Sequence, residues 1–90
     1  MKKIKTSVGY TAYQATAYET ALLGGAGICD HCNQFAPKGY LIPVLNHYVC
    51  RECFDRWEQR GKFYPEDLPV EQRTIAYYEA MIPVEGEGAV

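Results

Sequence analysis

Cys29-Asp30-His31-Cys32 and Cys50-Arg51-Glu52-Cys53 hold all four cysteines of the chain. They form two Cys-x-x-Cys pairs with residues 33–49 between them, a spacing typical of paired zinc-binding turns. Because four protein ligands leave no open position for water or substrate, such a site is predicted to be structural rather than catalytic. The pattern therefore predicts one tetrahedral Zn²⁺ ion, with the ligands Cys29, Cys32, Cys50 and Cys53.

A chain of 90 residues makes one small domain, whose hydrophobic core alone gives only marginal stability. Zinc is expected to supply the additional cross-link, so metal binding should be coupled to folding. Two disulfides or free thiols are the alternatives for four cysteines. The start of the chain, Met1-Lys2-Lys3-Ile4, carries charge without a following apolar segment, so no signal peptide is expected and a cytoplasmic location is predicted.

The net charge limits the classes of partner. The formal charge is −2, and four zinc-bound thiolates would bring it to about −4, which disfavours a dedicated nucleic-acid-binding protein. No apolar run approaches the roughly twenty residues that span a bilayer, so no membrane association is expected. The sequence predicts no small-molecule substrate.

The zinc finger itself is predicted to occupy residues 28–61. Residues 40–45 are the most strand-like run, and Asn46-His47 turns the chain into a short partner strand at residues 48–49. Phe54 and Trp57 then stand three apart among charged residues before Gly61, which indicates a short amphipathic helix that begins at the second cysteine pair. Its aromatic side should lie over the hairpin.

The flanks are predicted to be helical. Residues 1–9 are interpreted as a flexible basic arm. Residues 10–27 are interpreted as a helix that ends at Leu23, followed by a glycine-rich hinge. Residues 62–84 are expected to form a connection and a C-terminal helix packed on the finger, with Asp67 as its N-cap. Ile75, Tyr78 and Ile82 share one face of that helix, and residues 85–90 are expected to be a disordered tail.

Residues 28–61 are predicted to form three elements in succession: a zinc-binding turn, or knuckle, with the first cysteine pair, then a hairpin, then a helix that carries the second pair. In this order the chain resembles treble-clef zinc fingers, and as a whole it is similar to small uncharacterised zinc-finger proteins of bacteria and phages. The resemblance implies a small α+β zinc-stabilised domain. HNH endonucleases are related to treble clefs, but Gly39 and Tyr40 stand where the acid and the general-base histidine would be. The chain is therefore at most a degenerate HNH-like domain, and no enzymatic activity is predicted.

Two other chemical roles are weighed against the zinc site. His31 and His47 could ligate the metal only if a cysteine were displaced, so each is interpreted as an exposed or hydrogen-bonding residue. A redox role for either Cys-x-x-Cys pair is disfavoured, because no thioredoxin-like alternation of strands and helices surrounds them.

Two functional hypotheses remain. The first is a structural zinc module whose tyrosine-rich and aliphatic flanks contact a protein partner or a second copy of the chain. The second is nucleic-acid binding through the basic arm and the cations around the finger helix. Those cations alternate with acidic residues, a pattern typical of a solvated mixed-charge face. They are Lys2, Lys3, Lys5, Arg51, Arg56, Arg60 and Lys62.

Overall fold

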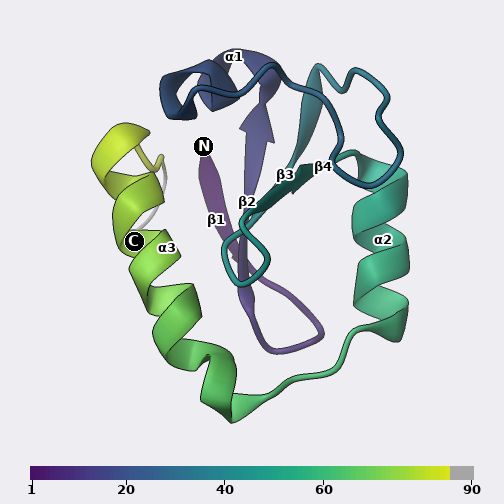
Figure 1. Cartoon of the computed structure of the whole chain (residues 1–90), viewed down its shortest axis with the longest axis vertical. Coiled ribbons are helices and arrows are strands. Elements are labelled where there is room, and N and C mark those ends of the chain that lie inside the picture. The colour runs from purple at the N-terminus through teal and green to yellow at the C-terminus, as the bar shows by residue number, and fades with distance from the viewer. Residues whose placement is uncertain (86–90) are drawn as a thin grey trace.

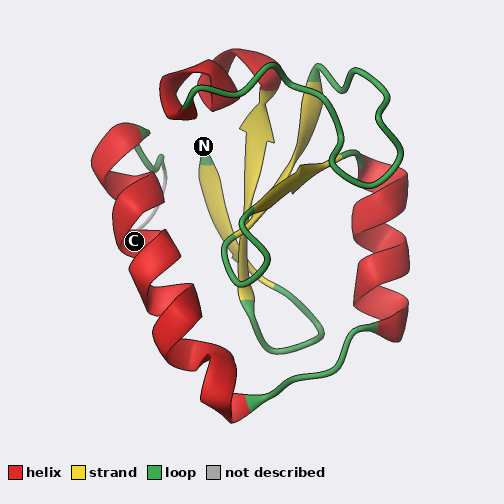
Figure 2. Ribbon diagram, viewed as in Figure 1, coloured by secondary structure: helices red, strands yellow, loops and turns green. Residues whose placement is uncertain are grey.

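The computed structural model describes residues 1–85, and its centre is a four-stranded antiparallel sheet in the order β1-β2-β3-β4 (Figure 1). Helices α2 and α3 stand on either side of the sheet, and α1 caps one of its ends (Figure 2). The elements in chain order are β1 (Lys2–Lys5), β2 (Thr11–Thr16), α1 (Ala17–Thr20), a 3₁₀ turn (Ala21–Leu23), β3 (Lys38–Ile42), β4 (His47–Val49), α2 (Arg51–Arg60), a second 3₁₀ turn (Pro65–Asp67) and α3 (Leu68–Met81).

Each face of the sheet is buried in its central part, under a different helix. Successive residues of a strand point to opposite faces. In β3, Tyr40 and Ile42 accordingly join the apolar cluster that Phe54 and Trp57 of α2 cover. Leu41, between them, joins the cluster that Tyr78 and Ile82 cover from the α3 side. The domain is thus a sheet between two helices with a hydrophobic layer on each side.

Helix α2 follows the prediction for the finger. It starts directly after Cys50, ends before Gly61, and buries Cys53, Phe54 and Trp57. The ring of Phe54 stacks on that of Tyr40 with centroids 4.0 Å apart and planes at 9°, so the aromatic side of the helix does lie over the hairpin. The predicted hairpin is also present, but its turn comes earlier than predicted: residues 43–46 form it, with a positive φ of 55° at Asn46, and His47 already belongs to β4.

The prediction of a loose arm and a helix at the N-terminus is wrong. Residues 2–5 form strand β1 and residues 11–16 form strand β2, so only residues 17–23 are helical. Threonine and tyrosine favour strands over helices, and β2 supplies Ala12 to one apolar cluster and Tyr13 to the other. The lysines of β1 suit an edge strand, where charged side chains discourage further strand pairing.

Helix α1 begins at a capping box. The side chain of Thr16 accepts a hydrogen bond from the Glu19 N–H at 3.1 Å, and the Glu19 carboxylate accepts one from the Thr16 N–H at 3.0 Å. Two backbone donors at the helix start are satisfied in this way. The Thr-x-x-Glu pattern was therefore the sequence signal for a change from strand to helix at residue 16.

The C-terminal helix forms where the spacing predicts it, with Tyr78 and Ile82 buried and Ile75 packed beside them. Asp67 is the N-cap residue of this helix, as predicted, but its side chain makes no capping bond and instead accepts a hydrogen bond from the Tyr10 hydroxyl at 3.4 Å. Of the predicted tail, the Glu85 N–H donates to the Met1 carbonyl at 2.8 Å, and residues 86–90 lie outside the described part of the chain.

Candidate metal centre

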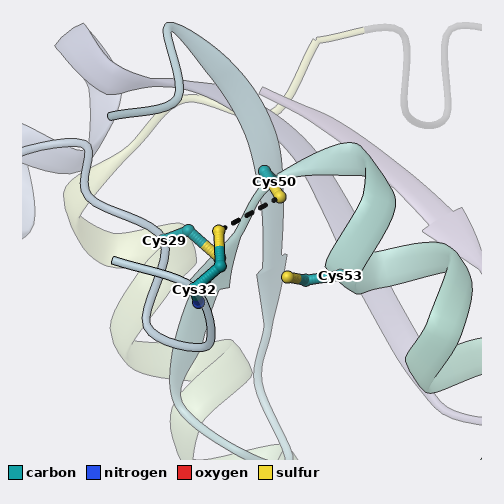
Figure 3. Close-up of side chains that lie close together, drawn as sticks. All are labelled: Cys29, Cys32, Cys50 and Cys53. Carbon is teal, nitrogen blue, oxygen red and sulfur yellow. Dashed lines mark hydrogen bonds between the residues drawn. The ribbon is translucent and has the colours of Figure 1, made fainter. Parts of the chain in front are cut away.

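The fold brings the two cysteine pairs together. The four Sγ atoms lie within 4.8 Å of one another, and together these cysteines could hold a metal ion. Figure 3 shows the pair from the loop facing the pair from the start of α2, with a separation of 3.8 Å between the sulfurs of Cys32 and Cys50. Cys29 and Cys53 are buried, whereas Cys32 and Cys50 are half-buried. The four predicted ligands therefore form one cluster, and none of them is in a disulfide.

The first pair sits in a tight loop closed by backbone hydrogen bonds. The Cys29 N–H donates to the Gln34 carbonyl at 2.8 Å, and the Asn33 N–H donates to the Cys29 carbonyl at 2.9 Å. Asn33 turns the chain with a positive φ of 62°, a conformation that asparagine tolerates better than most residues. This loop aims the N–H groups of His31 and Cys32 at the Cys29 sulfur, at 3.4 and 3.5 Å.

Asp30 ties the loop to strand β4. Its N–H donates to the Tyr48 carbonyl at 2.8 Å, and its carboxylate accepts a hydrogen bond from the Tyr48 N–H at 2.9 Å. The loop thereby occupies the open edge of β4, two residues before Cys50. Sequence reasoning missed this role. The only available signal was an aspartate placed inside the first cysteine pair, where a short carboxylate can bond to nearby backbone.

The second pair sits where strand β4 becomes helix α2. Cys50 is the N-cap residue, with an extended backbone, and its carbonyl accepts the first helical hydrogen bond from the Phe54 N–H at 2.9 Å. Cys53 lies in the first turn, and it is buried with the apolar cluster beneath the helix. A turn of helix therefore spaces these two sulfurs, while a tight loop spaces the other two.

The thiols of the cluster differ in acidity when no metal is bound. Burial alone would raise the pKa of Cys29, but hydrogen bonds from the N–H groups of Cys50, Cys32 and His31 outweigh it and lower that pKa to about 6. Burial, together with the neighbouring thiols, raises the pKa of Cys53 to about 12. Negative charge therefore settles first on Cys29. A metal that takes all four sulfurs as thiolates must displace the remaining protons.

The histidines contact each other beside the cluster. Nε2 of His31 lies 3.1 Å from Nδ1 of His47, and the two rings meet edge to face. Burial lowers the pKa of His31, as do the nearby His47 and Arg60. This contact links the loop of the first cysteine pair to the first residue of β4. The sequence could not show it, because the partners come from different local structures.

The positions compared with HNH endonucleases have packing roles here. Gly39 lies against the Val49 carbonyl, so closely that an added Cβ would be 2.5 Å from its oxygen, and the Tyr40 ring stacks on Phe54. Within residues 1–85, no helix is both long enough and apolar enough to cross a membrane.

The fold and the cluster define a small α+β domain that could bind one metal ion through four cysteines. No protein-family model matches the chain, and neither a curated protein nor a solved structure matches it.

Proposed function

We propose that the chain is a structural zinc-binding module of the treble-clef type. The observation that carries the proposal is the convergence of four sulfurs from a tight loop and a helix start, beside a β-hairpin. Thiolates are the ligands that zinc takes in closed structural sites. With Zn–S bonds of about 2.3 Å, the sulfurs of a tetrahedral site lie about 3.8 Å apart. The separation of Cys32 and Cys50 has that value.

The proposed metal would join parts of the chain that share little apolar packing. The loop of the first pair contributes only Cys29 as a fully buried member of the cluster beneath α2. Bound zinc would fix that loop to β4 and α2 and add its binding free energy to the free energy of folding. We accordingly assign the metal a role in stability, and we propose no catalytic activity for the closed site.

Metal analysis tests the site directly. Protein purified without added metal should contain about one zinc per chain, measured by elemental analysis, and Cys50→Ser should abolish it. His31→Ala and His47→Ala are matched controls beside the cluster, and both should keep the full zinc content. A parent protein without zinc that binds none on titration, or histidine variants that lose zinc as cysteine variants do, would contradict the assignment.

We further propose that the module contacts a protein partner through the apolar side chains around the first cysteine pair. Tyr18 is 83% exposed and Phe35 is 61% exposed, large values for aromatic rings. Gly27 lies against both Ala17 and Phe35, which places α1 beside the loop. Contiguous exposed apolar side chains favour protein contact. We call this set the knuckle surface, and it comprises Tyr18, Leu22, Ile28 and Phe35.

Site-specific photocrosslinking in the host tests the knuckle surface. A benzophenone amino acid at position 35 should yield a discrete crosslinked protein, whereas the same group at position 73, exposed on α3, should not. Sedimentation of the purified protein then decides whether the partner is a second copy. A strict monomer excludes self-association, and the lack of any position-specific crosslink would refute the partner role.

Nucleic-acid binding through helix α2 receives less support. Arg51 lies 3.6 Å from Asp55, and Arg56 lies 3.5 Å from Glu52, so the helix carries alternating charge as the sequence indicates. In β1, Lys3 pairs with Glu79 at 2.9 Å.

For the cellular location, we propose the cytoplasm, because a reducing compartment keeps four cysteines available for metal.

A further inference from the structure

One row of side chains on the α2 side of the sheet begins beneath the helix and extends beyond it. The strand register places Lys2 opposite Gln14 and Gln14 opposite Tyr40. Paired residues project from the same face, so these three side chains are neighbours. Tyr40 belongs to the cluster beneath α2, which identifies the face. Lys2 and Gln14 are nevertheless exposed, so the row runs from the buried core out to solvent.

A recess of about 300 Å³ lies on this row. Its described lining includes Gln14, Lys38, Tyr40 and Arg51. Lys38 is two residues before Tyr40 in β3 and therefore shares its face, and Arg51 is the first residue of α2. In Figure 1, the end of β2 and the start of α2 both lie in the upper half of the molecule. Two cations thus border the recess, and Lys2 adds a third at the end of the row.

No carboxylate is among the described residues that line this recess. Within residues 1–85, neither Lys2 nor Lys38 has an ion-pair partner, and the contact of Arg51 with Asp55 is a long one between exposed groups. Exposed pairs of this kind are worth little, so Arg51 can turn to a stronger anion at small cost. The recess therefore has an excess of positive charge on a chain whose net charge is −2.

Tyr40 adds a polar group to the lining. The residue is only 8% exposed, yet its hydroxyl makes no hydrogen bond with any described residue. The other deeply buried tyrosines, such as Tyr48 and Tyr78, each donate to an oxygen within the protein. No buried side-chain oxygen or nitrogen among residues 1–85 lacks a partner, so this unpaired hydroxyl is open to solvent at the recess, where it can donate to a ligand or to water.

We propose that this recess binds a phosphate group, carried either by a free nucleotide or by the backbone of a single nucleic-acid strand. Lysine and arginine would neutralise the phosphate charge, and Gln14 and Tyr40 would donate hydrogen bonds to its oxygens. A volume of about 300 Å³ is at the lower end for ligand pockets, which suits a phosphate with its sugar rather than a large organic molecule.

A competing explanation is that Lys38 and Arg51 only compensate the charge of the metal cluster, since Arg51 follows Cys50 directly. A tetrathiolate zinc site carries a net −2, which nearby cations would stabilise. In that case, neutral substitutions of Lys38 or Arg51 would weaken zinc binding, and added phosphate would not bind to the recess. The two explanations therefore predict different results for the same variants.

The experiment titrates zinc-loaded protein at low salt with inorganic phosphate, adenosine monophosphate and a twelve-nucleotide oligothymidylate. Amide chemical shifts report the site, and those of Gly39, Tyr40 and Arg51 should move first. Lys38→Gln and Arg51→Gln should each weaken binding about tenfold, because each removes a hydrogen bond to a charged group. Lys38→Arg should retain binding. Lys62→Gln, which removes an exposed cation outside the recess, is the matched control and should bind like the parent.

Tighter binding of the oligonucleotide, with affinity that falls as salt is added, identifies a strand as the ligand. Equal binding of the nucleotide and the strand identifies a single phosphate. The proposal is overturned if none of the probes binds, or if Lys62→Gln weakens binding as much as Lys38→Gln. It is also overturned if the recess variants change only the zinc affinity. Zinc content and circular dichroism of each variant show that a loss of binding is not a loss of fold.

Discussion

Tyr78 should make the stability of the domain fall at alkaline pH. Its side chain is 1% exposed, and its hydroxyl donates to Oδ1 of Asn46 at 2.8 Å, which joins α3 to the β3–β4 turn. Burial raises the pKa of Tyr78 above its ordinary value of 10.0, and the charge of Asp30 raises it further. The folded state therefore keeps this proton at a pH where the unfolded chain has lost it.

The sign and size follow from proton linkage. A raised pKa in the folded state contributes stability that is fully present below about pH 10 and is lost as the pH rises towards the folded pKa. For one such tyrosine, the loss between about pH 9 and pH 11 is about 1.4 kcal/mol. Burial also raises the pKa of Tyr48, to about 12, and that of Tyr10, so the parent should lose more than this single share.

Tyr78→Phe isolates the contribution of Tyr78 to the pH dependence of stability. Near pH 8 the variant should be less stable by about 0.5–1.5 kcal/mol, because the hydrogen bond to the exposed Asn46 side chain is lost while the ring packing remains. Since phenylalanine cannot ionise, this deficit should shrink by about 1.4 kcal/mol between pH 9 and pH 11. Urea denaturation of the zinc-loaded proteins measures both quantities. Tyr18→Phe, at a side chain that is 83% exposed, should match the parent throughout. A deficit that stays constant with pH would refute the reasoning.

Three further substitutions test the metal and the packing. Cys53→Ser should leave no cooperative thermal transition by circular dichroism. Structural zinc contributes about 10–16 kcal/mol, which is as much as the whole free energy of unfolding of a typical domain. A melting curve like that of the parent would contradict a structural metal. Gly39→Ala should cost about 1–3 kcal/mol in urea denaturation, since its Cβ would stand 2.5 Å from the Val49 carbonyl oxygen, which strand pairing holds in place. Phe54→Ala should cost about 3–5 kcal/mol by the same assay through loss of the stack on Tyr40, and a loss under 1 kcal/mol would show that the stack is not part of the core.

The cysteine cluster, the hairpin and helix α2 were predictable because their signals are local. The spacing of the cysteines, the turn at Asn46 and the change to helical period at Phe54 and Trp57 each depend on a few neighbouring residues. Strand β2 gave no such signal. As an inner strand with both faces partly buried, it places Ala12 and Tyr13 in different clusters, so polarity does not alternate along it. The helical spacing of Tyr10, Tyr13, Ala17 and Ala21 favoured a helix instead, but the chain becomes helical only from Ala17 onward.

Long-range contacts were beyond the sequence for a different reason. The bond from the Asp30 loop to β4 and the contact of His31 with His47 join residues whose local patterns carry no mark of the partner. The same holds for β1, whose lysines match a solvated arm as well as an edge strand. Only the pairing with β2 distinguishes the two, and that pairing depends on how the sheet as a whole is buried.

The metal centre and the proposed phosphate recess meet at the start of α2. Cys50 is the N-cap of that helix, and Arg51 is its first residue, so a metal that fixes Cys50 also fixes the backbone from which Arg51 reaches the recess. Binding free energies are reciprocal between coupled sites. Loss of zinc would therefore weaken phosphate binding, and bound phosphate would strengthen zinc binding. A metal whose coordination positions are all filled by the four cysteines would thus influence ligand binding at a neighbouring site without contacting the ligand.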